Sequence, residues 1–173
     1  TQKWTLFPYT TLFRSPTLPH KLTQNGPSLA KGDINGDGFE DFIIGSSSGY
    51  SPMIFTQNSD GTFKGTALFE DEASKKREET SISLFDLDND GDLDIYMVAG
   101  SNEFDFDSPY YQDYLMINQG NGKFERSTDK LPKINSSGSV VEAEDFDGDG
   151  YVDLFVGGRT PFSQYPKPDD CYL

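Results

Sequence analysis

Apolar and polar residues alternate in three short segments of the chain, and an acidic stretch separates each segment from a continuous apolar run. The alternating segments read SLAKG, SISLF and VVEAE, and the apolar runs read FIIG, LDIYMV and LFVGG. Alternation with period two predicts a strand with one buried face, and the β-branched and aromatic runs also favour strand over helix. The pattern therefore predicts three copies of one unit, in which an acidic loop joins two strands.

The first two copies continue with a further apolar segment and a turn, in residues 53–63 (MIFTQNSDGTF) and 114–124 (YLMINQGNGKF). The recurring turn residues are Asn58, Gly61 and Phe63, repeated as Asn118, Gly122 and Phe124 with one extra residue in the second turn. Asn, Asp and Gly between apolar runs are typical of a hairpin. We therefore expect four strands in each complete copy.

The acidic loops read DINGDGFED, DLDNDGDLD and DFDGDGYVD, and they begin at residues 33, 86 and 145, which are 53 and 59 residues apart. A repeat of this length with several strands in each copy indicates a β-propeller. The predicted fold is all-β: a partial propeller of two complete blades and part of a third, with calcium loops between strands. The expected blade limits are about 26–75, 76–135 and 136–173.

Oxygen-bearing side chains occupy positions 1, 3, 5 and 9 of every loop, and position 6 is always glycine. Ca²⁺ takes several oxygen ligands in irregular geometry, and glycine permits the sharp turn that brings them together. Position 7 is expected to offer its backbone carbonyl oxygen, so its side chain is free to vary. The sequence thus predicts up to three Ca²⁺ ions, held by Asp33, Asn35, Asp37, Phe39 and Asp41, by Asp86, Asp88, Asp90, Asp92 and Asp94, and by Asp145, Asp147, Asp149, Tyr151 and Asp153.

An EF-hand loop begins in the same way but requires a bidentate acid at position 12 and flanking helices. Position 12 is Ile44, Met97 or Val156 here, and none of these side chains can bind calcium. Thrombospondin-type calcium repeats would interleave cysteines with the acids, and Cys171 is the one cysteine of the chain. The remaining alternative is a set of acidic surface turns, which three copies in one register disfavour.

The formal charge of the 173-residue chain is −15, and the acidic side chains predicted to bind at loop positions 1, 3, 5 and 9 account for eleven of its 29 acids. Such an acidic chain is expected to repel nucleic acid and anionic membranes. No apolar run is long enough for direct membrane insertion. Calcium loops of this kind are usually filled where calcium is abundant, so the expected location is extracellular, on the cell surface or periplasmic. One cysteine allows no internal disulfide and leaves the redox compartment open.

The N-terminal segment 5–15, TLFPYTTLFRS, matches the in-frame translation of a common sequencing-library adapter at every codon. We therefore expect residues 1–15 to be foreign to the gene and the propeller segment to cover residues 16–173. On this interpretation, the absence of a visible signal peptide carries no information about the native N-terminus.

Three stretches, KGDINGDGFEDFIIG, SNEF followed by YQDYLMIN, and DLFVGGRTPFSQYP, resemble the FG-GAP or VCBS repeat proteins. The propeller blades of that family are similar to those of the integrin α-subunit head. More narrowly, the three stretches are similar to those of bacterial FG-GAP proteins related to cartilage acidic protein. The resemblance implies calcium at loop positions 1, 3, 5 and 9, a secreted or cell-surface propeller of commonly seven blades, and no catalytic apparatus. It also implies that this chain is a fragment, with the remaining blades missing. Asn35 departs from the acidic pattern, which lowers the charge of the first loop.

The leading functional hypothesis is a non-catalytic module that recognises an unknown protein or glycan. The alternative is the propeller part of a secreted glycan-active enzyme, since acid pairs such as Glu142 with Glu144 are plentiful. The sole histidine, His20, lies beside the suspect leader, and no nucleophile motif accompanies it. Aromatic residues in 101–114 are expected to pack between blades, with stacking on a sugar ring as the second interpretation.

Overall fold

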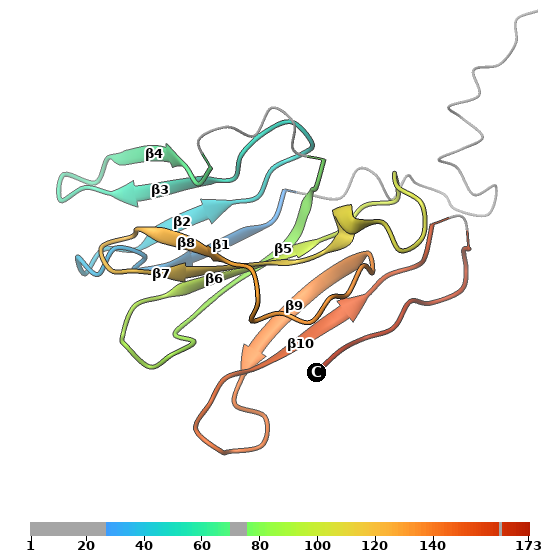
Figure 1. The fold of residues 1–173 in the computed structure, drawn as a ribbon. Coiled ribbons are helices and arrows are strands. Elements are labelled where there is room, and N and C mark those ends of the chain that lie inside the picture. Colours follow the sequence, from blue (N-terminus) through green and yellow to red (C-terminus); the bar gives the residue numbers. More distant parts are fainter. Residues whose placement is uncertain (1–26, 70–75, 163) are drawn as a thin grey trace, which may run out of the picture.

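A computed structural model describes residues 27–69, 76–162 and 164–173, which form three antiparallel sheets that follow one another along the chain (Figure 1). The predicted N-terminal leader lies outside the described residues. Within the described residues the only helical element is a single 3-10 turn, and no helix is long and apolar enough to cross a membrane. The prediction of an all-β fold is confirmed.

The first sheet has four strands in the order β1-β2-β3-β4. Their bounds are Leu29–Gly32 for β1, Asp41–Ile44 for β2, Met53–Gln57 for β3 and Phe63–Ala67 for β4. The last residue of β1, Gly32, pairs with the first residue of β2, Asp41, so the acidic loop closes a hairpin. The alternation in β2 places Ile43 in the core, while Phe42 stacks on Phe55 across the other face with ring centroids 4.8 Å apart.

The second sheet repeats this arrangement in the order β5-β6-β7-β8. Its strands are β5 (Glu79–Phe85), β6 (Asp94–Ala99), β7 (Tyr114–Asn118) and β8 (Phe124–Ser127), and the 3-10 turn η2 (Pro109–Tyr111) precedes β7. Every residue of β6 is buried, because this strand lies between neighbouring sheets on both faces. This buried position explains why the residues of β6 after Asp94 are apolar without interruption.

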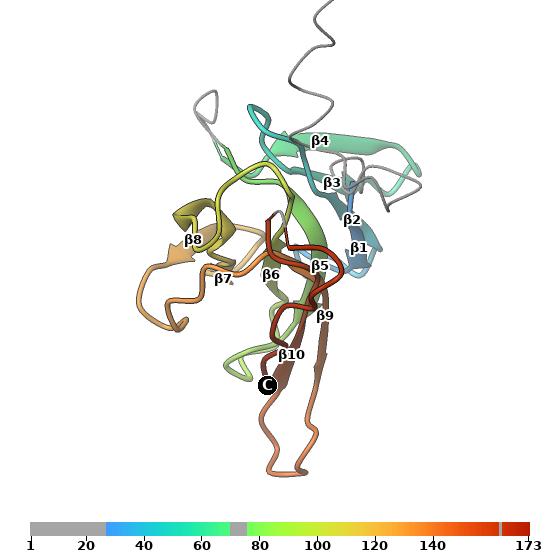
Figure 2. The ribbon, with the colours of Figure 1, turned by 90° about the vertical axis from the view of Figure 1, so that its right-hand side faces the viewer.

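The third sheet contains β9 (Gly138–Glu144) and β10 (Asp153–Gly158). At the outer edge of β10, Val156 forms an isolated antiparallel bridge with Tyr172. The described part of the chain therefore holds two complete blades and part of a third, as predicted, and the sheets do not close into a ring. Figure 2 shows the loop end of the β9–β10 hairpin projecting beyond the other two sheets.

Two apolar clusters hold the sheets together. One lies between the first and second sheets and is made of Ile34, Ile43, Ile54, Ile82, Ile95, Met97, Tyr114 and Met116. The other lies between the second and third sheets and is made of Phe85, Tyr96, Val98, Leu115, Val141 and Val156. Because the two faces of β6 contribute to different clusters, the second sheet is the central layer of this structure.

The turns after β3 and β7 correct one detail of the expected repeat. Gln57 pairs with Phe63, and Asn118 pairs with Phe124, so both turns contain five residues. The prediction of an extra residue in the second turn, with Asn58 equivalent to Asn118, is wrong. Strand register aligns Gln57 with Asn118, whereas matching by residue type had shifted the alignment by one position.

The aromatic residues of segment 101–114 divide between two environments. Tyr111 and Tyr114 are buried, as expected for packing, while Phe106 and Tyr110 are 63% and 40% exposed. Phe104 packs against Tyr110 with ring centroids 4.7 Å apart. Burial is therefore confirmed for part of this segment only.

Asp113, just before β7, is half-buried. Burial raises its pKa to about 7, although hydrogen bonds from the Ala99 amide (2.8 Å) and the Tyr96 hydroxyl (2.7 Å) and the charge of Arg77 act in the opposite direction. Between pH 4 and pH 7 the folded chain retains a proton that the unfolded chain has lost. Asp113 therefore lowers the free energy of unfolding as the pH rises through this window.

We expect the substitution Asp113→Asn to remove this contribution, because the amide oxygen can still accept from Ala99. The native chain should lose stability relative to the variant by at most about 1.4 kcal/mol per pH unit between pH 4 and pH 7. Urea denaturation of both proteins in EDTA at pH 5 and pH 7.5 measures this difference. An identical pH dependence in the two proteins would contradict the assignment.

Candidate metal centres

Each acidic loop joins the first and second strands of its sheet, so the strand registers fix where the loop begins and ends. The residue before each loop and the ninth loop residue face each other across the hairpin, as Gly32 and Asp41 do in the first copy. The three loops lie on the same side of the molecule, at the left and lower left in Figure 1. Position 12 falls inside a strand in every copy, as expected for a loop unrelated to an EF-hand.

The carboxylate at position 1 organises the backbone of its own loop. In the first loop, Asp33 accepts hydrogen bonds from the amides of Asp37 (3.0 Å) and Gly38 (2.8 Å). Asp86 accepts from the amides at the same two positions of the second loop, and so does Asp145 in the third. These bonds curl the loop around the first carboxylate, which brings positions 1, 3 and 5 toward one centre.

Left-handed backbone conformations make this curl possible at two positions. Position 6 is a glycine with positive φ in every copy, such as Gly38 with φ 87°, as the sequence predicted. Position 4 is also left-handed in every copy, at Gly36, Asn89 and Gly148. The sequence analysis missed position 4, although its glycine or asparagine in each loop is the residue type that tolerates this conformation.

The carboxylate at position 9 joins the loop to the third strand of its sheet. Asp94 is 1% exposed; its Oδ2 accepts from the Leu87 amide (2.9 Å) and its Oδ1 from the Asn118 amide (2.8 Å). Asp41 accepts the equivalent bonds from Ile34 and Gln57. In two loops, position 9 is thus a buried carboxylate that accepts two backbone hydrogen bonds. This structural role does not depend on a bound metal.

Asn118 connects the first loop to the second sheet. Its side-chain amide donates to the carbonyl oxygens of Ile34 (3.0 Å) and Leu93 (3.2 Å), while its backbone amide donates to Asp94. Ile34, at position 2 of the first loop, is 1% exposed in the core between the two sheets. The first and second loops are therefore joined by one hydrogen-bonded network through Asn118. The spacing of residues in the sequence does not predict this network.

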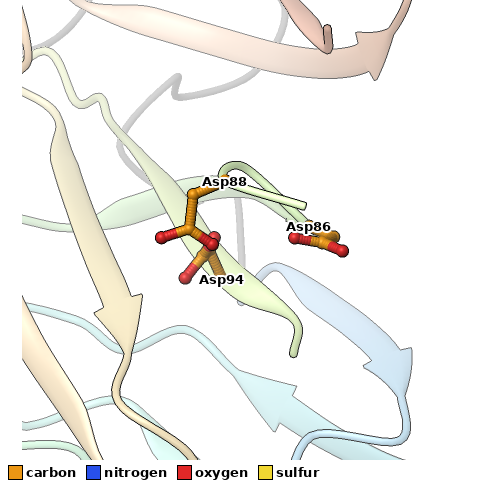
Figure 3. Close-up of side chains that lie close together, drawn as sticks. All are labelled: Asp86, Asp88 and Asp94. Carbon is orange, nitrogen blue, oxygen red and sulfur yellow. The ribbon is translucent and has the colours of Figure 1, made fainter. Parts of the chain in front are cut away.

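Two loops bring three carboxylates together. Ligand oxygens of Asp86, Asp88 and Asp94 lie within 4.8 Å of one another, and Figure 3 shows these side chains at the loop before β6. Asp145, Asp147 and Asp149 form the second such group in the described chain. Neither group includes Asp90 or Asp153.

The first loop has a different arrangement. Asn35 replaces the acid at position 3, and its side-chain amide donates to Asp37 at 2.9 Å. The loop does not form a group of three acids among the described residues. The complete ligand set proposed from sequence, including the carbonyl oxygens of Phe39, Asp92 and Tyr151, stays a prediction.

The charge of the second loop is concentrated around a poorly solvated carboxylate. Burial raises the pKa of Asp94 above its ordinary value, and the nearby charges of Asp88 and Asp90 raise it further, against the lowering effect of its two amide hydrogen bonds. Three convergent carboxylates and a turn that fixes them are the donor set that a hard divalent cation prefers. The residues of the second and third loops therefore fit a calcium ion.

Serial four-stranded antiparallel sheets joined by short connections define a β-propeller type of repeat protein. The model of the FG-GAP-like repeat matches residues 33–97 and 98–156, which together are more than half of the chain, and the chain therefore belongs to the FG-GAP-like repeat family. No curated protein matches the chain at a significant level. The two matched repeats end at Met97 in β6 and at Val156 in β10, which are equivalent positions in their sheets. Each matched repeat therefore begins in one sheet and ends in the next.

Proposed function

We propose that this chain is a calcium-stabilised, non-catalytic recognition module that works outside the cytoplasm, where it binds a protein or glycan. The observation that carries the calcium part is the convergence of three carboxylates in each of two loops, with ligand oxygens within 4.8 Å of one another. A bound ion would supply positive charge that offsets the mutual repulsion of these acids. Asp86, Asp88 and Asp94 would hold it in the second loop, and Asp145, Asp147 and Asp149 in the third.

The location follows from the same loops. Weak sites, with dissociation constants on the order of 10⁻⁴ to 10⁻³ M, are typical of extracellular modules, because calcium there is abundant enough to fill them. Bound ions would also reduce the formal charge of −15, which otherwise opposes close approach of an acidic partner.

The exposed aromatic residues before β7 support a recognition role. Phe106 and Tyr110 are 63% and 40% exposed, and Ser108 between them caps the short turn η2 by accepting from the Tyr110 amide. Flat aromatic faces held on an ordered turn are suited to stacking on sugar rings or on apolar side chains. The acids Asp105 and Asp107 beside them offer acceptors for hydroxyl groups.

Binding to a panel of immobilised glycans and extracellular matrix proteins, in calcium and in EDTA, tests the proposal. We expect at least one ligand to bind in calcium, and the double change Phe106→Ala and Tyr110→Ala to weaken that binding about tenfold or more. Asp129→Ala, a change of an exposed acid in the connection between β8 and β9, is the control. Ligand binding that the aromatic double variant leaves unchanged would refute the assigned surface, and ligand turnover would refute the non-catalytic role.

A further inference from the structure

The first acidic loop carries an Asn-Gly pair, Asn35 and Gly36, at positions 3 and 4. In such a pair the backbone nitrogen of the glycine can attack the side-chain carbonyl carbon of the asparagine, because glycine has no Cβ to obstruct the approach. Position 3 is aspartate in the second and third loops. Among the three loops, the first is therefore the one that combines a side-chain amide with a following glycine.

The side chain of Asn35 is folded back over the residue that would attack it. The amide of Asp37 donates to Asn35 Oδ1 at 3.0 Å, and Asn35 Nδ2 donates to Asp37 Oδ2 at 2.9 Å. The first of these bonds closes an Asx turn around Gly36, which holds the side-chain carbonyl group beside the peptide bond between Asn35 and Gly36. The Asp37 N–H also points at the oxygen that gains negative charge during the attack, as an oxyanion donor does.

The backbone nitrogen of Gly36 is available for this reaction. Gly36 is exposed, and within the described chain its amide donates no hydrogen bond. In the third loop the equivalent amide, that of Gly148, donates to Asp145 at 2.7 Å. A Cβ built at Gly36 would meet only Asp92 Oδ1 within 4 Å, at 3.8 Å, so the first loop has room to change conformation during the reaction.

Loss of the Asn35 amide would give the first loop the acids of the third loop. Both loops would then carry aspartate at positions 1, 3 and 5 and glycine at positions 4 and 6. In the third loop the three carboxylates converge, with ligand oxygens within 4.8 Å of one another. The same backbone hydrogen bonds organise both loops, because position 1 accepts from the amides of positions 5 and 6 in each. Replacement of Asn35 Nδ2 by oxygen is therefore the change that gives the first loop the donor set of the third.

We propose that Asn35 is a site of spontaneous deamidation, and that the aspartate formed there raises the calcium affinity of the first loop toward that of the third. The calcium consequence rests on the proposed function, in which the second and third loops bind calcium. The added carboxylate strengthens the first site because the affinity of a calcium loop rises with the charge of its ligands. The modification itself requires no metal.

The reaction consumes water and releases ammonia. The Gly36 nitrogen bonds to Asn35 Cγ and gives up its proton, the bond between Cγ and Nδ2 breaks, and Nδ2 leaves as ammonia with that proton. Water then adds at Cγ, the bond between Cγ and the Gly36 nitrogen breaks, and this nitrogen regains a proton from the water. The product is aspartate in an unaltered backbone. Water that adds at the backbone carbonyl carbon of residue 35 gives isoaspartate instead.

Incubation of the chain in EDTA at mildly alkaline pH, followed by peptide mapping with mass spectrometry, tests the modification. We expect aspartate to accumulate at position 35, and the variant Gly36→Asn to slow the reaction about tenfold or more, because its side chain obstructs the attack. This variant is the matched control, since Asn89 occupies position 4 of the second loop with φ 59°, close to the φ of 73° at Gly36. Unmodified Asn35, isoaspartate without aspartate, or an equal rate in the variant would overturn the proposal.

Isothermal titration of calcium into the variant Asn35→Asp tests the consequence. The substitution is made in a chain that also carries Asp88→Asn and Asp147→Asn, so that the first loop dominates the signal. We expect the first loop to bind calcium about tenfold or more tightly with Asn35→Asp than without it. Equal affinity, while the native second and third loops bind calcium, would overturn this inference alone. Absence of binding at all three native loops would refute the calcium part of the proposed function and this consequence with it, whereas the peptide map would still test the modification.

Discussion

Calcium at 10 mM is expected to raise the free energy of unfolding by about 5 kcal/mol relative to EDTA. A site with a dissociation constant on the order of 10⁻⁴ M contributes about 2.7 kcal/mol at a hundredfold excess of ligand, and two loops hold convergent carboxylates. For a chain of this size, the melting temperature should rise by about 10 to 20 °C. Urea denaturation and thermal melting in the two buffers measure the effect.

The double substitution Asp88→Asn and Asp147→Asn is the control for this prediction. Both residues are exposed, so their substitution should leave the free energy of unfolding in EDTA nearly unchanged. Each belongs to one of the two carboxylate groups, so the double variant should lose most of the stabilisation by calcium. Magnesium at the same concentration should stabilise less, because it demands tighter octahedral geometry. Equal stabilisation of the native and doubly substituted chains would show that calcium acts elsewhere.

The second large effect concerns position 9 and does not require calcium. In EDTA, Asp94→Asn is expected to lower the free energy of unfolding by about 2 kcal/mol or more. Both oxygens of Asp94 accept from backbone amides, so the NH₂ group of asparagine would have to face one of these N–H donors. Asp41→Asn should behave in the same way, since Asp41 is equally buried and also accepts two amide bonds.

Asp153→Asn is the matched comparison within the chain. Asp153 is half-buried and accepts from Phe146, so an amide oxygen can keep that bond while the nitrogen turns away from it. Its cost should stay below about 1 kcal/mol. Urea denaturation in EDTA ranks the three variants, and a cost for Asp153→Asn equal to that for Asp94→Asn would contradict the structural role assigned to position 9.

The sequence predicted those features that depend on local pattern. Alternation in SISLF and the apolar run after Asp94 located β5 and β6, and the glycine at position 6 located the loop turn. These signals are local because strand periodicity and left-handed backbone conformations leave traces within a few residues.

Features that depend on packing between sheets could not be predicted in this way. Asn118 reaches the Ile34 carbonyl across 84 residues of sequence, and only the contact between the first two sheets brings them together. Matching by residue type also aligned Asn118 with Asn58. The strand register aligns it with Gln57 instead, because Gln57 pairs with Phe63 and Asn118 pairs with Phe124. Likewise, the exposure of Phe106 and the burial of Tyr111 differ through their places around η2, although both residues are aromatic.

The central claim is that the repeated acidic loops bind calcium. Isothermal titration of calcium into chain freed of metal by EDTA and dialysis tests it most directly, with the variant Asp88→Asn and Asp147→Asn titrated in parallel. We predict saturable binding of two ions, with the Asn35-containing loop as a weaker third site, and loss of the two stronger sites in the variant. Absence of saturable binding up to 10 mM calcium, roughly ten times the weakest affinity typical of extracellular modules, would contradict the claim.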